Sequence, residues 1–552
     1  DELQPRPAGV RRFGFELENL AVEEPAAPHD VLQDAQRRGR IERRRRDGHA
    51  FGLRGQGACD GRGDERILFA TPGFQLIALN AKTGQLVPTF GKDGVVDLKM
   101  DDDQDMDLVT GEVGLHATPV VAKDVVIVGA AHRTGANPKT INNVKGYVRG
   151  FNVRTGERLW IFHTIPKPGE FGHESWLKGS AENTGNTGVW AQISVDEELE
   201  TVSLPVEQPT GDYFGANRPG DGLFGETLLA VDLYTGKRKW HYQLVHHGLW
   251  DNDIPCAPIL IDVKVDGKVV KAVAQPTKQA FLYVFDRVTG KPVWPIVERP
   301  VPKGNVPGEW YSPTQPMPTR PQAYDRQGVT ENDLIDFTPA LRTQALEIVK
   351  NYVLGPIFTP PSVRGEGANA KLGTIQLPGS SGGANWNGGA FDPETGLFYL
   401  GSRTVAFVAD LFAPESTRSD LRYRAAMREI VNGPQGLPIM KPPYGRVVAY
   451  DMNRGEIRWT VANSDGPRNH PALAGLTLPP LGDATPSAVI VTKTLLFQTQ
   501  ADKSTPRSPA NVGGTKFRAL DKATGAVLAE IDLGVGQNNT PMTFMHEGKQ
   551  YV

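Results

Sequence analysis

The densest group of reactive side chains lies in one short segment. It reads Gln243-Leu-Val-His246-His247-Gly-Leu-Trp250-Asp251-Asn-Asp253-Ile-Pro255-Cys256. Two histidines, a tryptophan and two aspartates stand close together here, and such a set could bind a metal ion or supply a general base. The same residues also suit a polar turn that an anchored tryptophan holds in place. Composition alone leaves both interpretations open.

Lys278 is a second candidate for chemistry, in the phrase Gln275-Pro-Thr-Lys278-Gln. It stands between the apolar segments Val269–Val273 and Phe281–Val284. A lysine between two strands is usually solvated, with its aliphatic stem lying along apolar surface. The ammonium group could instead hold an anionic or quinone oxygen.

Other residues carry weaker signals. Trp190 is either ordinary core or a flat platform for a planar ligand. Thr210 and Asp212, in Gln208-Pro-Thr210-Gly-Asp212, read first as a turn, and Thr118 opens a strand after His116. The glycine-rich phrase Gly382-Gly-Ala-Asn-Trp386 lacks the spacing and the βαβ setting of a nicotinamide site. A nicotinamide-dependent dehydrogenase is therefore poorly supported.

The elements that must position these residues are marked by a repeated phrase, Asp/Asn-x-x-Thr-Gly-x-x-x-Trp. Strong copies run over 152–160, 232–240, 286–294 and 451–459, the last with Arg in place of Thr. Weaker copies without the tryptophan lie at 80–84, 392–396 and 521–525. Internal repetition of this kind decides architecture before any local pattern does.

The physics of the phrase is that of a β-hairpin. An apolar strand enters, the Asp or Asn side chain bonds N–H groups of the turn, and Gly takes a positive φ. The chain then returns as a strand with Trp on its buried face. A radial stack of four-stranded sheets uses such units because no blade buries both faces alone. Unrelated hairpins would not repeat Trp at one offset, so the repeat predicts an all-β propeller.

Composition limits the function further. The chain has 552 residues and a formal net charge of −3, which gives no case for nucleic acid or an anionic membrane surface. No run of eighteen apolar residues occurs. The only cysteines are Cys59 and Cys256, and without Cys-x-x-Cys-His covalent haem c is excluded. The sequence begins at Asp1 with no apolar signal segment, so we expect any export signal or anchor to lie outside it.

The chain divides into an atypical start and a strand-rich remainder. Residues 1–62 are Arg-rich and show little strand alternation, as expected of a solvated basic tail or of non-native sequence. Residues 63–552 are predicted to form the propeller, with loop excursions at about 296–380 and 408–445. Helical patterns over Thr330–Tyr352, capped by Thr330, and over Ser419–Val431 predict one helix in each excursion. Long loops of this kind often cover functional faces.

From about Gly63 to the end, the chain resembles the quinoprotein dehydrogenases that use pyrroloquinoline quinone (PQQ), especially the glucose dehydrogenase-like branch. The resemblance rests on the Trp repeat, on the His246–Pro255 phrase and on the spacing of Lys278 from Asp251. It also rests on Tyr311-Ser-Pro-Thr-Gln-Pro316, Gly355-Pro-Ile-Phe-Thr-Pro-Pro361 and Thr540-Pro-Met-Thr543. The resemblance implies an eight-bladed β-propeller with Trp-docking repeats. We expect the first blade and the last strand to be incomplete in this sequence.

The resemblance also implies roles for residues. Asp251 would be the general base and a metal ligand, and Lys278 would bond the reactive quinone oxygens. Trp190 would stack under PQQ and Thr118 would bond cofactor oxygens. Ser402 stands where family members often carry a cofactor-binding Asn. Thr210 falls at a calcium-shell position, so calcium is the expected metal.

These roles predict a periplasmic PQQ-dependent dehydrogenase that oxidises a sugar or cyclic polyol. Electrons would pass to a separate membrane quinone or cytochrome, since the chain has no haem motif. Two alternatives stay open at this stage. One is a non-catalytic propeller scaffold, and the other is an inactive fragment of the enzyme.

Overall fold

We describe the chain from a computed structural model, over residues 64–109, 113–114, 118–132, 138–365, 370–426, 429–503 and 512–552. Two compact units are distinguished, and the larger comprises Leu53–Ala81 with Gln85–Val552. The smaller unit comprises Asp1–Gly52 and Lys82–Gly84. The Arg-rich segment 1–62 of the sequence prediction lies outside the described residues. Everything below concerns the larger unit.

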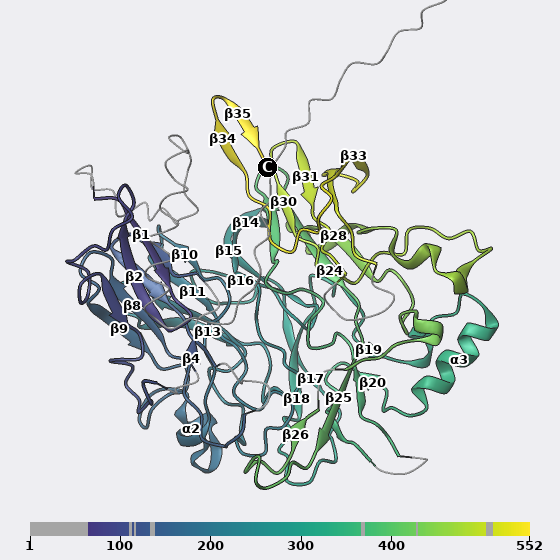
Figure 1. Cartoon of the computed structure of the whole chain (residues 1–552), viewed down its shortest axis with the longest axis horizontal. Helices are drawn as coiled ribbons and strands as arrows, with labels where there is room; N and C mark the ends of the chain where they lie inside the picture. Colours follow the sequence, from purple (N-terminus) through teal and green to yellow (C-terminus); the bar gives the residue numbers. More distant parts are fainter. Residues whose placement is uncertain are drawn as a thin grey trace, which may run out of the picture. The chain divides into compact units, whose positions relative to one another are not determined.

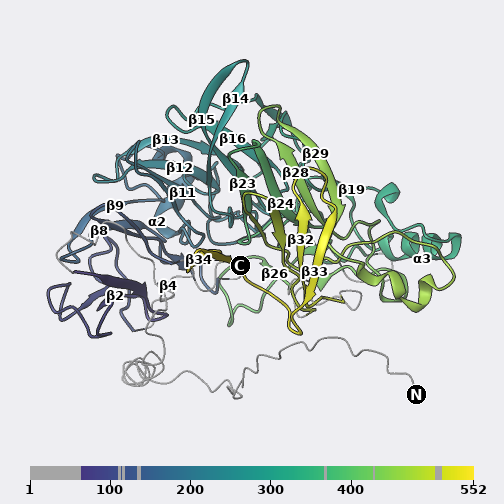
Figure 2. The same ribbon diagram turned by 90° about the horizontal axis from the view of Figure 1, so that it is seen from above.

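Four antiparallel sheets of four strands form the framework (Figure 1). Two come from the first half of the chain: β5 (Val120–Ala122), β6 (Val125–Val128), β8 (Val148–Asn152) and β9 (Arg158–Phe162), then β10 (Ser194–Asp196), β11 (Thr201–Pro205), β12 (Thr227–Asp232) and β13 (Arg238–Gln243). Two come from the second half: β23 (Gly389–Asp392), β24 (Leu397–Arg403), β28 (Gly445–Asp451) and β29 (Glu456–Ala462), then β30 (Val489–Val491), β31 (Leu495–Gln498), β32 (Lys516–Asp521) and β33 (Val527–Asp532). In Figure 2 the strands β23, β24, β28 and β29 lie side by side.

The chain also forms smaller sheets of two or three strands. Three-stranded sheets are β1 (Arg66–Ala70), β2 (Gln75–Asn80) and β3 (Val95–Asp97), and β14 (Ile259–Val265), β15 (Lys268–Pro276) and β16 (Leu282–Asp286). Two-stranded pairs are β4 (Val113–Gly114) with β7 (Ala131–His132), β17 (Ile296–Pro300) with β18 (Thr314–Pro318), β19 (Gly328–Val329) with β20 (Gly355–Pro356), and β34 (Phe544–His546) with β35 (Lys549–Tyr551). Helices are short: α2 (Ser180–Asn183), α3 (Pro339–Val349) and 3-10 turns at His173–Ser175, Leu177–Gly179, Glu331–Asp333, Pro434–Gly436, Gly466–Asn469 and Pro471–Leu473. No helix in the described ranges is long and apolar enough to cross a bilayer.

The repeated phrase forms a hairpin turn as the sequence predicts. In the 232–240 copy, Asp232 Oδ1 accepts hydrogen bonds from the backbone N–H groups of Tyr234 (3.2 Å) and Thr235 (3.0 Å). Gly236 follows with φ +64°, a conformation that glycine adopts without a steric penalty. The chain then returns as β13, whose Trp240 is buried. The turn chemistry therefore fixes where β12 ends and β13 begins.

Each strong tryptophan contacts the turn of another copy of the phrase. Trp160 Nε1 donates to Leu233 O (2.9 Å) and Trp240 Nε1 donates to Arg287 O (3.0 Å). The glycines of those turns, Gly236 and Gly290, lie so close that an added Cβ would meet the indole ring. The other two indoles behave alike, Trp294 against Gly455 and Trp459 against Gly525. The tryptophans thus join one sheet to a neighbouring one.

The weak copy at 392–396 occupies a different place from the others. Its turn joins β23 to β24, the first two strands of their sheet, whereas the 232 and 451 copies join the last two. Gly396 faces Asn453 rather than a tryptophan. Trp294 accordingly contacts the 451 copy, and the 392 copy is a hairpin of similar chemistry within the same sheet.

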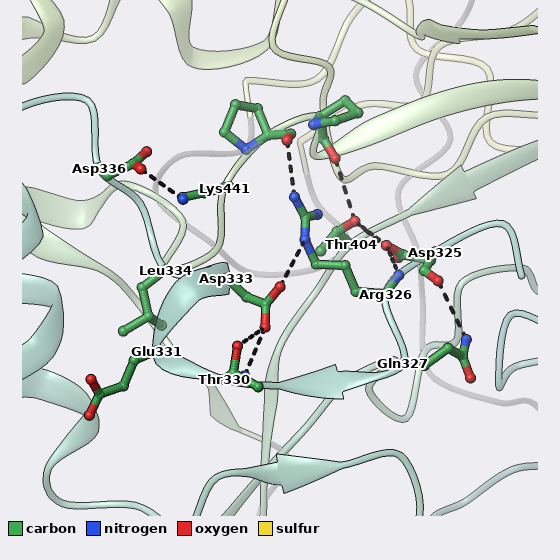
Figure 3. A network of polar contacts seen from close by, with 12 residues as sticks. Asp325, Arg326, Gln327, Thr330, Glu331, Asp333, Leu334, Asp336, Thr404 and Lys441 are labelled. Carbon is green, nitrogen blue, oxygen red and sulfur yellow. Dashed lines mark hydrogen bonds and ion pairs between the residues drawn. The ribbon is translucent and has the colours of Figure 1, made fainter.

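The first excursion contains the predicted helix in a shorter form. The helix α3 begins at Pro339, and Thr338 caps it by accepting from the Leu341 N–H (3.2 Å). Thr330 instead caps the 3-10 turn Glu331–Asp333, where its N–H and hydroxyl both donate to Asp333 Oδ2 (2.8 and 2.6 Å; Figure 3). The predicted cap was therefore assigned to the wrong helical segment.

A polar network ties this excursion to the end of β24 (Figure 3), and Arg446 extends it to β28. The Thr404 hydroxyl donates to the buried carboxylate of Asp325 (2.8 Å), which also pairs with Arg446 (3.0 Å). Lys441 pairs with Asp336 (2.7 Å) at the edge of the same network. These contacts hold the segment after β18 against the ends of two framework strands.

The helix predicted over Ser419–Val431 is wrong. The described residues there form β26 (Arg424–Ala425) and β27 (Glu429–Ile430), and both pair with β25 (Phe407–Phe412). Together with β21 (Ser362–Val363) and β22 (Thr374–Gln376) they make a five-stranded sheet. The pairing partner of both short strands, β25, lies outside this segment, so the local helical pattern could not reveal it.

Candidate active site

Lys278 sits in a tight turn between β15 and β16. The turn is fixed by Thr277, whose N–H donates to the Tyr324 hydroxyl (3.0 Å) and whose Oγ1 donates to Phe281 O (2.9 Å). Only 4% of Lys278 is exposed, so this side chain is buried rather than snorkelling as lysines between strands usually do. A buried ammonium needs anionic or carbonyl partners.

Those partners come from the loop after β13. Lys278 Nζ lies 2.6 Å from Asp251 Oδ1, 2.9 Å from Asp251 O and 3.0 Å from Asp253 Oδ2. The loop is held in place by Leu249, Trp250 and Ile254, which pack in a core cluster with β15 and β16. One cation and two carboxylates therefore meet in a site almost closed to water.

Asp253 also receives a backbone hydrogen bond, from Gln208 N to Oδ1 (2.9 Å). Burial opposes ionisation of this carboxyl, but the charge of Lys278 and the hydrogen bonds outweigh it and lower the pKa of Asp253. Asp253 is thus held as a carboxylate at neutral pH, and it orients the ammonium of Lys278.

Two further acids near this group, Glu207 and Glu226, have pKa values shifted in the opposite direction from that of Asp253. Burial raises the pKa of Glu207 and of Glu226 well above the usual range, and the charge of Asp253 adds to the shift of both. Glu207 Oε1 accepts from the Gly188 N–H (3.1 Å), two residues before Trp190. These shifts favour the neutral form of both glutamates, whereas the shift of Asp253 favours its carboxylate.

The two histidines of the loop are structural. His246 contacts Gln243 Oε1 (2.7 Å) and Glu298 Oε1 (3.1 Å) through its two ring nitrogens. His247 is buried between Gly220 O (3.0 Å) and Glu309 Oε1 (3.2 Å), and burial lowers the pKa of its ring. All four ring nitrogens have protein partners, so the metal interpretation of this phrase gains no support.

Thr210 lies near the site but is engaged with backbone. Its Oγ1 accepts from the Gly185 N–H (3.1 Å), and its carbonyl accepts from Arg218 Nε (3.0 Å). No group of three His, Cys, Asp or Glu side chains in the described ranges could hold a metal ion. With an ammonium against Asp251, this arrangement is not preformed for calcium, and calcium remains a prediction.

The predicted cofactor residues occupy three different situations. Trp190 is half-buried. Ser402 is 3% exposed, and its hydroxyl has no hydrogen-bond partner among the described residues. Thr118 is exposed. A partly open indole and an orphaned buried hydroxyl suit a planar, oxygen-rich ligand such as PQQ.

Sequence reasoning missed two parts of the site. Asp253 was noted only as part of the phrase, although the Asp-x-Asp spacing beside a strand end could have suggested a shared cation. Glu207 gave no signal, because its burial depends on segments far away in the sequence. Local sequence patterns identify residues with reactive side chains, but they do not show which of these residues the fold brings together.

Comparison with known proteins agrees with this architecture. A family model described as "PQQ: Glucose/ethanol/alcohol dehydrogenase, beta-propeller domain" matches residues 31–552. The chain therefore belongs to the PQQ-dependent dehydrogenase family, and its antiparallel sheets are those of an all-β propeller.

The similar proteins are themselves quinoproteins. The quinate/shikimate dehydrogenase (quinone) of Acinetobacter baylyi is 30% identical over 88% of this chain, and the quinoprotein glucose dehydrogenase of Escherichia coli is 29% identical over 88%. The chain spans 60% of the length of each. In fold, it is similar to the quinohemoprotein alcohol dehydrogenase of Comamonas testosteroni, with a TM-score of 0.56 and 22% identity over 90% of this chain and 63% of that one.

Proposed function

We propose that this chain is the catalytic propeller of a PQQ-dependent dehydrogenase that oxidises a hydroxyl group of a sugar or cyclic polyol. The observation that carries the proposal is the buried contact of Lys278 with Asp251 and Asp253. The names of the similar proteins, which act on glucose or on quinate and shikimate, support this range of substrates.

Asp251 is the proposed general base. Its carboxylate is 2% exposed, and an alcohol that reached it would meet little competing water. When bound, PQQ would supply the hydride acceptor. Asp251 would take the hydroxyl proton from the same alcohol, a contribution that is typically worth about 10²–10⁴ in rate.

Lys278 is the proposed electrophilic partner. An ammonium group has three N–H donors, and here they point to Asp251 O, Asp251 Oδ1 and Asp253 Oδ2. Binding a quinone oxygen would exchange one of these contacts while the others keep the ammonium charged and in place. A preformed donor of this kind stabilises negative charge as it develops.

Trp190, Ser402 and Thr118 complete the proposed cofactor contacts, Trp190 by stacking and the hydroxyls by hydrogen bonding. The exposed position of Thr118 gives its role the least support. Calcium at Thr210 and Asp251 is part of the same proposal, and no step above depends on it.

The wider setting is also a proposal. We infer an eight-bladed ring with a tryptophan at each strong junction, a periplasmic location, and a membrane quinone or a cytochrome as electron acceptor. A propeller scaffold has no need for a buried Lys–Asp–Asp group, so that alternative is not favoured.

Reconstitution tests the proposal directly. The purified chain is mixed with PQQ, with and without calcium, and dye-linked oxidation is measured on a panel of sugars, cyclic polyols and hydroxy acids. Turnover that requires PQQ is expected. Failure of the folded chain to bind PQQ or to oxidise any member of the panel would remove the proposal.

A further inference from the structure

Arg403 is a buried cation that the function proposed above leaves unused. It ends β24 and is 9% exposed. Its side chain lines a small cavity together with Gly383, Asn387, Ser402, Thr485 and Ser487. No acidic side chain lines this cavity.

The side chain of Arg403 makes one hydrogen bond in the described part of the chain, from Nη2 to Ser381 O (3.0 Å). A guanidinium carries five N–H donors, and no described carboxylate lies within 4.0 Å of this one. Burial lowers the pKa of Arg403 to about 10, so the group remains charged at neutral pH.

Three other buried arginines have more partners than Arg403. Arg446, in β28 beside β24, pairs with Asp325 (3.0 Å), and Arg149 pairs with Asp102 (3.2 Å). Arg218 has no described carboxylate partner but donates to three backbone carbonyls, those of Thr210, Gly211 and Gly248. Arg403 differs from these three because its side chain donates to one described acceptor and lines a cavity.

The neighbouring residue has the same deficit. The Ser402 hydroxyl is buried in the same cavity without a hydrogen-bond partner among the described residues. An anion with two oxygens satisfies a guanidinium and a hydroxyl together, and carboxylates do so in a planar, bidentate manner.

The cavity adjoins the catalytic group through the backbone. The Arg403 N–H donates to Gly383 O (3.0 Å), and the Gly383 N–H donates to Lys278 O (2.9 Å). A ligand bound at Lys278 could therefore extend a charged group toward Arg403.

We propose that Arg403 and Ser402 form a subsite for a carboxylate group of a ligand bound at Lys278. This inference rests on the proposed function. The carboxylate has two possible sources, which are the cofactor, since PQQ is a tricarboxylic acid, and an acidic substrate such as a hydroxylated cyclic acid.

Equilibrium binding separates the two sources. PQQ and its trimethyl ester, whose carboxylates are neutralised, are titrated into the full chain by fluorescence quenching. Quinate and glucose are titrated into the PQQ-loaded chain by thermal shift. Each titration is repeated with Arg403→Gln, with Arg403→Lys, and with Arg454→Gln as a control that removes an exposed guanidinium.

If the cofactor supplies the carboxylate, Arg403→Gln weakens PQQ binding at least tenfold, leaves the trimethyl ester unchanged and is partly rescued in Arg403→Lys. If the substrate supplies it, PQQ binding stays within twofold, and the quinate affinity falls at least tenfold without a change for glucose. Unchanged binding of both PQQ and quinate would overturn the subsite.

Two further measurements keep the subsite testable if Arg403→Gln does not fold or if the unaltered chain binds no PQQ. If Arg403→Gln does not fold by circular dichroism, Ser402→Ala decides instead, with an expected loss of about threefold to tenfold in the same titration and no loss overturning the subsite. If the unaltered chain binds no PQQ, the proposed function fails separately. Quinate alone must then raise its melting temperature in an Arg403-dependent manner, or the subsite fails too.

Discussion

The ammonium of Lys278 lies 2.6 Å from Asp251 Oδ1, and both side chains are at least 96% buried although 27 residues separate them in the sequence. Each residue therefore forms part of the other's environment. Substituting one of them changes the charge balance around the other, and variants at this pair need to be compared with a double variant.

Replacing Asp251 by Asn should abolish base catalysis while keeping the shape of the site. We expect the rate of PQQ-loaded protein to fall by about 10²–10⁴, with PQQ binding retained, because an amide cannot accept the proton. Single-turnover kinetics and a PQQ titration check this. Asp105→Asn, at an exposed position, is the matched control, and equal rates for Asp251→Asn and the control would rule Asp251 out as the base.

Replacing Lys278 by Met should destabilise the fold. Two buried carboxylates would then face each other without their cation, which is expected to cost about 3–5 kcal/mol in the free energy of unfolding. Urea denaturation measures the loss. The double variant Lys278→Met with Asp251→Asn should recover part of it, and a double variant that is less stable by the full sum would contradict the pairing.

His241 should make stability fall as the pH is lowered. It packs against Phe171 and Phe224, and burial together with the charge of Arg238 lowers the pKa of its ring to about 4. Between about pH 6.5 and 4 the unfolded chain therefore binds this proton and the folded chain does not, so the contribution present above pH 6.5 is lost as pH falls.

The check is a series of melting temperatures from pH 7.5 to 4.5 for the original chain and for His241→Phe. The slope over this window should be smaller in the variant. His546→Gln, at an exposed histidine, serves as the control. Identical slopes for the original chain and His241→Phe would show that the ring does not carry the effect.

Gly236→Ala should lower the free energy of unfolding by more than the strain at its positive φ explains. An added Cβ would lie 2.6 Å from the Trp160 ring, besides the strain of φ +64°. Gly267, in the β14–β15 hairpin, has φ +79° but nothing within 4 Å, so Gly267→Ala reports the backbone strain alone. We expect Gly236→Ala to lose about 1–3 kcal/mol more in urea denaturation, and equal losses would deny the contact any energetic role.

The sequence predicted the hairpins because their information is local. The side chain of Asp232, the glycine four residues later and the returning Trp240 lie within one phrase. The helix prediction for Ser419–Val431 was wrong for the opposite reason, because the strands found there form by pairing with β25, which lies outside the segment. The copy at 392–396 shows that one turn chemistry can serve two positions in a sheet.

The resemblance singled out Asp251 and Lys278, in two phrases that spacing alone does not connect. The structure shows that the two side chains are in contact, and their proposed roles stay predictions. Asp253, Glu207 and Arg403 were not assigned roles. Their significance comes from burial and from non-local contacts, and a single sequence does not display either.

The contact of each strong tryptophan with a glycine of another copy has an evolutionary consequence. The phrases that end at Trp160, Trp240 and Trp459 each lie within one sheet, and each indole contacts the glycine turn of another copy. A duplicated sheet therefore carries its own turn and its own indole, and both halves of a Trp–Gly junction remain available to its neighbours. The family's repeats are thus expected to have been gained as whole sheets, with later insertions such as the α3 excursion placed between junctions.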